Sequence, residues 1–102
     1  MKRSVPLFLI LALIGCASAP APRVSKAYGD LGKAKLVLNE DYQGAVTDFT
    51  RAIEFNPKDA QLYMLRGMAY RKQGDQESAN ADFKRAISLD ASLKKALQPL
   101  MR

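Results

Sequence analysis

Residues 48–53 read DFTRAI and residues 82–87 read DFKRAI, so five of six residues recur at a spacing of 34. Three pairs of residues outside these stretches match at the same spacing: Asp41 with Asp75, Ala45 with Ala79, and Asn56 with Asp90. A fixed period of this length is typical of helix–turn–helix repeats, which bury their apolar faces by stacking on one another. The repeat therefore predicts an all-α fold of stacked helix pairs.

The apolar residues of both copies follow the spacing of an amphipathic helix. They are Ala45, Val46, Phe49, Ala52 and Ile53 in the first copy, and Ala79, Phe83, Ala86 and Ile87 in the second. The alanines allow two helix backbones to approach closely, and the phenylalanines fill the space between helices. Two acid–base pairs at i, i+3 spacing, Asp48 with Arg51 and Asp82 with Arg85, are expected on the exposed faces, where each is worth about 0.2–0.5 kcal/mol.

In period and in residues, the chain resembles the tetratricopeptide repeat family. Counted from Ala60, six residues fall on the signature positions of the family: Tyr63, Gly67, Tyr70, Ala79, Phe83 and Ala86. The copy departs from the family at Arg66, where leucine is usual, and at Ala91, where proline is usual. The resemblance implies antiparallel helix–turn–helix pairs that form a short solenoid.

The first copy, residues 26–59, is degenerate in its first helix. In register with the second copy, Gly29, Gly32 and Lys33 stand where an aromatic residue, leucine and glycine are expected. A shift of one residue places Tyr28, Leu31 and Gly32 there instead, and it requires one extra residue before the second helix. Both registers stay open, with the shifted one preferred.

Helices are expected near residues 26–38, 42–55, 59–72 and 76–89. Asn56 and Pro57 separate the two middle helices, and Gly74 ends the third. Residues 92–97 are expected to form a short cap before Pro99, which interrupts a helix. The repeat domain then spans residues 26–98, with repeats at about 26–59 and 60–93.

The N-terminus has the layout of an export signal. Lys2 and Arg3 precede the apolar run VPLFLILALI at residues 5–14, and Cys16 follows it. The ending Leu-Ile-Gly-Cys resembles the lipobox of bacterial lipoproteins, in which the cysteine is acylated and becomes the first residue. This resemblance implies a signal peptide at residues 1–15 and lipidation of Cys16. Residues 16–25, rich in alanine and proline, are expected to form a flexible tether.

A lipid anchor on Cys16 would hold the protein on a membrane surface. In Gram-negative lipoproteins, an aspartate directly after the cysteine tends to mark retention in the inner membrane. Here Ala17 stands at that position. The resemblance therefore implies the outer membrane of a bacterial cell envelope, on the side facing the periplasm.

The composition favours binding over catalysis. The chain has no histidine, one cysteine and a formal net charge of +6. Histidine is the commonest general base and metal ligand, so the sequence predicts no enzyme activity, no catalytic residues, no metal and no cofactor. The basic residues are interleaved with acidic ones and accompany no RNA-binding motif, so nucleic acid is not an expected partner.

Family geometry implies a partner-binding face formed by first-helix positions. In this chain these positions are Gln61, Met64, Met68, Arg71 and Lys72. Two methionines beside two cations would form a pliable apolar patch with a positive rim. We expect a protein–protein interaction scaffold or assembly factor that binds a peptide or helix of another envelope protein. The alternative is an accessory protein or hydrolase that acts on cell-wall polymer.

Two repeats are few for a solenoid, because the terminal faces need covering. Residues 92–97 are expected to cover one end. The other end, with Leu31, Leu36, Val37 and Leu38, is expected to be closed by the helix of a partner or by a second copy in a homodimer.

Overall fold

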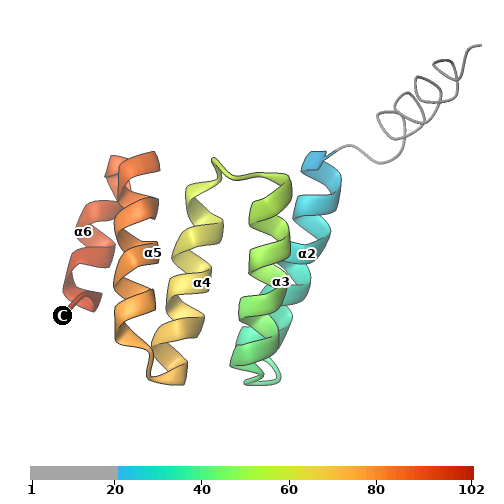
Figure 1. Cartoon of the computed structure of the whole chain (residues 1–102), viewed down its shortest axis with the longest axis horizontal. Coiled ribbons are helices and arrows are strands. Elements are labelled where there is room, and N and C mark those ends of the chain that lie inside the picture. Colours follow the sequence, from blue (N-terminus) through green and yellow to red (C-terminus); the bar gives the residue numbers. More distant parts are fainter. Residues whose placement is uncertain (1–20) are drawn as a thin grey trace, which may run out of the picture.

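The computed structural model describes residues 21–102, and in this part of the chain all regular secondary structure is helical, with no strand. The main helices are α2 (Ala21–Val37), α3 (Tyr42–Phe55), α4 (Ala60–Gln73) and α5 (Gln76–Leu89). A C-terminal segment adds the 3-10 turn η1 (Ala91–Leu93), the short helix α6 (Lys94–Leu97) and the 3-10 turn η2 (Gln98–Leu100). The helices stand side by side in chain order, from α2 at one end of the row to α6 at the other (Figure 1). The predicted all-α class and helix pairing are confirmed.

Aspartates begin three of the four main helices, because a carboxylate there accepts hydrogen bonds from free backbone N–H groups. Asp41 accepts one from Gly44 N at 2.9 Å, Asp59 accepts one from Gln61 N at 3.0 Å, and Asp75 accepts one from Ser78 N at 3.1 Å. These caps explain why α3, α4 and α5 begin within one residue of the predicted positions.

The first helix begins earlier than predicted. Residues 21–25 belong to α2, so the flexible tether predicted over residues 16–25 is wrong for these five positions. Pro22 lies in the first helical turn, where proline is tolerated because a backbone N–H at this position has no partner within the helix. Ser25 is buried and its hydroxyl donates to the carbonyl oxygen of Ala52 at 2.9 Å, which holds this end of α2 against α3. The predicted signal peptide, Cys16 and the rest of the tether lie outside the described residues.

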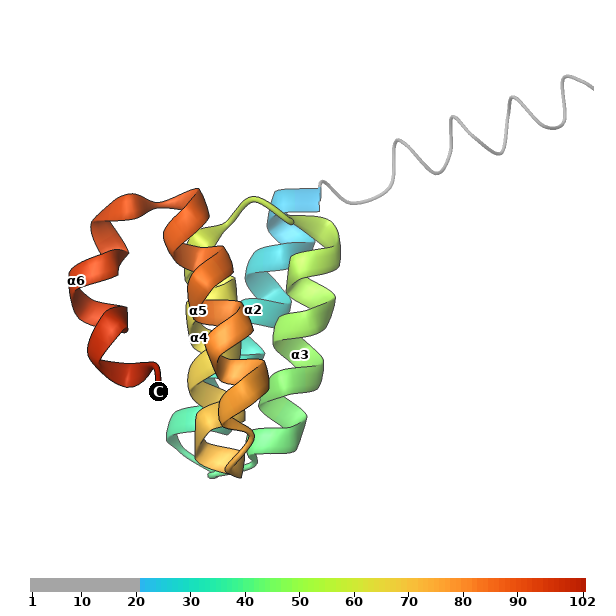
Figure 2. The same ribbon diagram turned by 60° about the vertical axis from the view of Figure 1, so that its left-hand side comes forward.

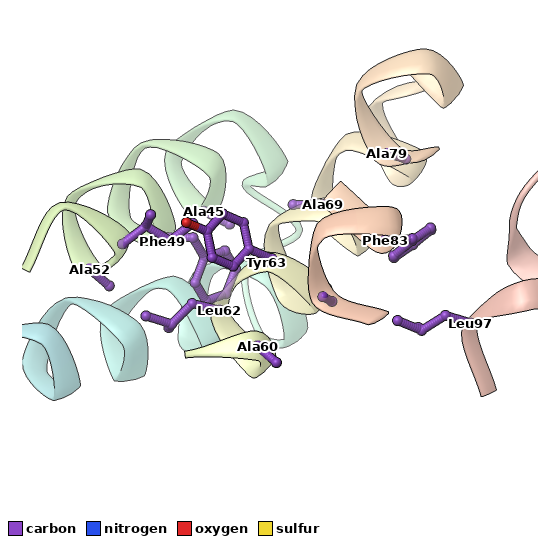
Figure 3. Close-up of a cluster of buried hydrophobic side chains, with 12 residues drawn as sticks. Ala45, Phe49, Ala52, Ala60, Leu62, Tyr63, Ala69, Ala79, Phe83 and Leu97 are labelled. Atoms are coloured by element: carbon purple, nitrogen blue, oxygen red, sulfur yellow. The ribbon is translucent and has the colours of Figure 1, made fainter. Parts of the chain in front are cut away.

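Each helix pair closes around a phenylalanine that packs on a glycine. Phe49 and Phe83 are fully buried. A Cβ atom added to Gly32 would lie 2.7 Å from the Phe49 ring, and one added to Gly67 would lie 2.7 Å from the Phe83 ring. Gly32 is therefore the structural counterpart of Gly67, which places the first copy in the shifted register. Figure 3 shows the surrounding core, to which Leu62 and Tyr63 also belong.

The extra residue of the first copy lies in the turn after α2. In the second copy, Gly74 at φ 89° ends α4, and its N–H donates to Arg71 O while Asp75 N donates to Tyr70 O, a Schellman motif. In the first copy, Glu40 at φ 53° takes the left-handed position, and Asp41 N donates to Lys35 O. The bond from Asp41 to Lys35 spans one residue more than the bond from Asp75 to Tyr70. The longer turn therefore contains the extra residue that the shifted register requires.

Asp48 and Asp82, which occupy the same position in the two copies, are buried rather than exposed, which corrects the predicted surface pairs. Asp82 accepts hydrogen bonds from Arg66 Nε and Nη2, both at 2.8 Å, and Asp48 lies 2.9 Å from Lys35 Nζ. Arg85, the expected partner of Asp82, instead lies over the Tyr63 ring. Each aspartate thus joins the second helix of its repeat to the first.

The C-terminal segment covers the outer side of α5, as predicted (Figure 2). Leu97 is 2% exposed, and Leu93, Leu100 and Met101 pack partly buried against the same core. Gln76 Nε2 on α5 donates to the carbonyl oxygen of Leu100 at 3.0 Å. The cap extends to Met101, beyond the predicted end at residue 97.

Candidate partner-binding site

Two hollows lie between α2 and α4, the first helices of the two repeats, and we call the two hollows together the groove. The hollow at their N-terminal ends has a volume of about 120 Å³. Lys26, Gly29 and Lys33 line it from α2, and Gln61 and Leu65 line it from α4. Gly29 leaves room for the Leu62 side chain, since an added Cβ would lie 3.4 Å from Leu62 Cδ2.

The second hollow lies at the C-terminal ends of the same helices and is larger, at about 320 Å³. Its lining comes from the end of α2, the following turn and α4: Leu36, Val37, Glu40, Tyr42, Met68 and Lys72. Val37 is 71% exposed and Met68 is 37% exposed. This hollow therefore offers open apolar surface with one cation and one anion at its edge.

Charges at the first hollow form a small cluster on α2. Lys26 Nζ lies 2.7 Å from Asp30 Oδ2, and Lys33 Nζ lies 3.7 Å from Asp30 Oδ1. The hydrogen bond from Lys26 lowers the pKa of Asp30 and raises the pKa of Lys26. All three side chains are exposed, so the pairs add little to stability. One aspartate between two lysines leaves a net positive charge beside the groove.

Three of the five predicted site residues line one of the two hollows, and two do not. Gln61 lines the first hollow, and Met68 and Lys72 line the second. Met64 is partly buried against the core, and Arg71 is half-buried; neither lines a hollow. Instead of the expected single patch, the structure has two separate hollows.

Sequence reasoning missed the wall of the site that α2 provides. In the shifted register, the five residues that precede Gln61, Met64, Met68, Arg71 and Lys72 by 35 positions are Lys26, Gly29, Lys33, Leu36 and Val37. Each of these five residues lines one of the two hollows: three line the first hollow and two line the second. The same family offsets would have found them, had the register of the first copy been settled.

Arg66 holds α4 in place between its neighbours. Its guanidinium donates to Asp82 on α5 and, through Nη1, to Thr50 Oγ1 on α3 at 3.2 Å. The bond with Asp82 raises the pKa of Arg66. The residue that departs from the family pattern thus links both repeats and fixes one wall of the groove.

Within residues 21–102 there is no group of three His, Cys, Asp or Glu side chains able to hold a metal ion. None of the described helices combines the length and apolar character needed to cross a bilayer.

Two family profiles match this part of the chain. One, described as TPR repeat, covers residues 35–74, and the other, described as tetratricopeptide repeat, covers residues 60–97. Together with the two helix pairs and their phenylalanine–glycine contacts, these matches define the class. The chain belongs to the tetratricopeptide repeat family.

Three longer proteins are similar to parts of this chain. The chain is 42% identical over 65 residues to the Protein SGT1 homolog of Oryza sativa subsp. japonica and 27% identical over 85 residues to that of Bos taurus. It is 30% identical over 90 residues to a UDP-N-acetylglucosamine–peptide N-acetylglucosaminyltransferase of Giardia intestinalis. These matches cover 63%, 83% and 88% of this chain, and 18%, 25% and 6% of the relatives. The chain thus spans a quarter or less of the length of each.

Proposed function

We propose that this protein is an interaction scaffold that holds a segment of another protein in the groove between α2 and α4. Tetratricopeptide repeats imply a protein–protein interaction scaffold. The observation that carries the proposal is the second hollow, where the exposed side chains of Val37 and Met68 lie beside Lys72. An apolar hollow of this kind suits a hydrophobic anchor of a peptide or helix, and the lysine suits a neighbouring carboxylate.

The scaffold acts by binding and not by catalysis, and we place it in a bacterial cell envelope. The N-terminal sequence supports this cellular location, because Lys2 and Arg3 are followed by the apolar residues 5–14 and then by Cys16. A lipid on Cys16 would anchor the domain to a membrane, with the outer membrane favoured by Ala17. Its partner is then another envelope protein, which the scaffold helps to assemble.

Site-specific photocrosslinking tests the groove. A photoreactive benzoylphenylalanine is placed at Gln61 or Met68 in the two hollows, and at Lys84 on the exposed side of α5 as a matched control. We expect both groove positions to give the same adduct with another protein, and Lys84 to give none. An adduct from Lys84 alone, or none from either groove position, would contradict the proposal.

The anchor is tested separately. Labelled palmitate should mark the wild-type chain in its bacterial host and leave Cys16→Ser unlabelled, and this variant should move from the membrane to the soluble envelope fraction. A wild-type chain that takes no label and fractionates as soluble would refute the anchor without touching the groove.

A further inference from the structure

An apolar stripe with heptad spacing runs along the outer face of α2 and ends at Leu38, the residue directly after this helix. Val24, Leu31 and Leu38 lie seven residues apart, and Ala27 and Ala34 lie between them at the intermediate heptad position. Leu31 is 47% exposed and Leu38 is 77% exposed. Among the described elements, α2 is the last helix at its end of the row (Figure 1). An apolar stripe with this spacing is typical of a helix that packs lengthwise against another helix.

The stripe is separate from the surfaces that α2 uses inside the fold. Ser25 and Gly32 face α3, and Gly29 faces Leu62 of α4. At about 100° per residue, Leu31 projects about 100° away from Gly32 and about 160° away from Gly29. Packing on the stripe would therefore leave both hollows of the groove open.

In the second repeat, the corresponding face of α4 packs against the preceding repeat. Tyr63 and Arg66 follow Tyr28 and Leu31 by 35 positions, the spacing of the two buried glycines. Tyr63 donates to the carbonyl oxygen of Pro57, and Arg66 donates to Thr50, so this face of α4 is covered by the preceding repeat. The corresponding face of α2 has no preceding repeat within residues 21–102.

Two features indicate a second copy as the occupant. The stripe is symmetric about Leu31, so in an antiparallel pair Val24 of each copy meets Leu38 of the other. In such a pair Arg23 of one copy lies opposite the uncharged Asn39 of the other, whereas a parallel pair would set Arg23 against Arg23. The opposite end of the row is covered by α6, so a head-to-tail contact has no open α5 face to use.

We propose that two copies of this chain pair through α2, antiparallel and with Leu31 on the two-fold axis. The inference does not depend on the proposed function. The dimer would present two grooves at once, so a partner with two binding segments would be held with higher avidity than by one groove.

Cysteine crosslinking of the full chain tests the pairing and its direction. Cys16 is the sole cysteine, so Cys16→Ser gives a thiol-free background. In that background, Leu31→Cys should form a disulfide between copies under a mild oxidant. Val24→Cys and Leu38→Cys should crosslink when mixed and much less when alone. Lys84→Cys, exposed on α5, is the control and should stay monomeric.

Sedimentation of Cys16→Ser, with and without Leu31→Glu, gives an independent readout. We expect the charge to shift the chain from dimer to monomer while its helical circular dichroism is unchanged. A monomeric parent, or Leu31→Cys that stays uncrosslinked because residues 1–20 or another protein cover the face, would overturn the proposal. Crosslinking of Val24→Cys and Leu38→Cys each with itself would overturn the antiparallel arrangement.

Discussion

At the scale of single residues, the two buried aspartates, Asp48 and Asp82, are paired with cations from different positions of the preceding helix. The Asp82 side chain is 7% exposed, and its charge is neutralised by the two-point contact with Arg66. Asp48 is buried in the same place in the first repeat, but Leu31 replaces arginine there. Lys35, one turn later, supplies the cation, and its direct contact with Asp48 raises the pKa of Lys35.

Replacing Arg66 by leucine, the usual residue of the family at this position, should therefore destabilise this protein. We expect Arg66→Leu to lower the free energy of unfolding by about 3–5 kcal/mol, because the Asp82 carboxylate stays buried without a partner. Urea unfolding followed by circular dichroism measures the loss. The double variant Arg66→Leu with Asp82→Leu should recover most of it. If Arg66→Leu were as stable as the wild type, the ion pair between Arg66 and Asp82 would not stabilise the fold.

At the scale of elements, the aspartate caps set where the helices begin. Hydrogen bonds from the hydroxyl and the backbone N–H of Ser78 lower the pKa of Asp75 below its ordinary value of 3.8. A lowered pKa means that the charged form stabilises the folded state above the unfolded pKa. This contribution is lost as the pH falls through the lower pKa of the folded state.

The variant Asp75→Asn isolates the charge, since asparagine also caps helices well. Wild type should be more stable than the variant near neutral pH, and the difference should shrink as the pH falls below about 4. Urea titrations of both proteins over this range measure it. A difference that stays constant with pH would show that the charge of Asp75 adds nothing to the cap.

At the scale of the whole molecule, the two ends of the helix row differ. The α5 end is sealed by the side chain of Leu97 and by the hydrogen bond from Gln76 to Leu100. The α2 end keeps its apolar stripe exposed. The molecule is therefore closed on one side and open on the other.

Removing the seal should weaken the entire domain, because α5 forms half of the second repeat. We expect Leu97→Ala to lower the free energy of unfolding by about 2–5 kcal/mol. Val37→Ala, at a side chain that is 71% exposed, is the control and should change it by less than about 0.5 kcal/mol. Equal effects of the two changes in urea unfolding would show that the C-terminal segment does not support the fold.

Local sequence signals were sufficient for α3, α4 and α5. Apolar spacing, the aspartate caps and Gly74 lie within or beside these helices, and their bounds agree with the prediction to within one residue. The start of α2 could not be read in this way. Residues 21–25 show no hydrophobic period, and Ser25 is ordered by a bond to Ala52, which lies in another helix.

The same reasoning accounts for what was predicted of the site. The α4 side was found from family offsets, because the second repeat has an unambiguous register. The α2 side depended on a turn that is one residue longer, with Glu40 in the left-handed conformation that usually favours glycine. The burial of Asp48 and Asp82 was missed because their cations come from the preceding helix and not from the i+3 position.

The central claim is that the first copy is a true repeat in the shifted register, since this makes α2 the second wall of the groove. Gly32→Ala and Gly29→Ala test it most directly through their free energies of unfolding. An added Cβ at Gly32 would lie 2.7 Å from the fully buried Phe49 ring, so we expect a loss of about 1–3 kcal/mol. At Gly29 it would make an ordinary contact at 3.4 Å, so alanine should be neutral or stabilise the helix by up to about 1 kcal/mol. A loss at Gly29 with no loss at Gly32 would contradict the claim.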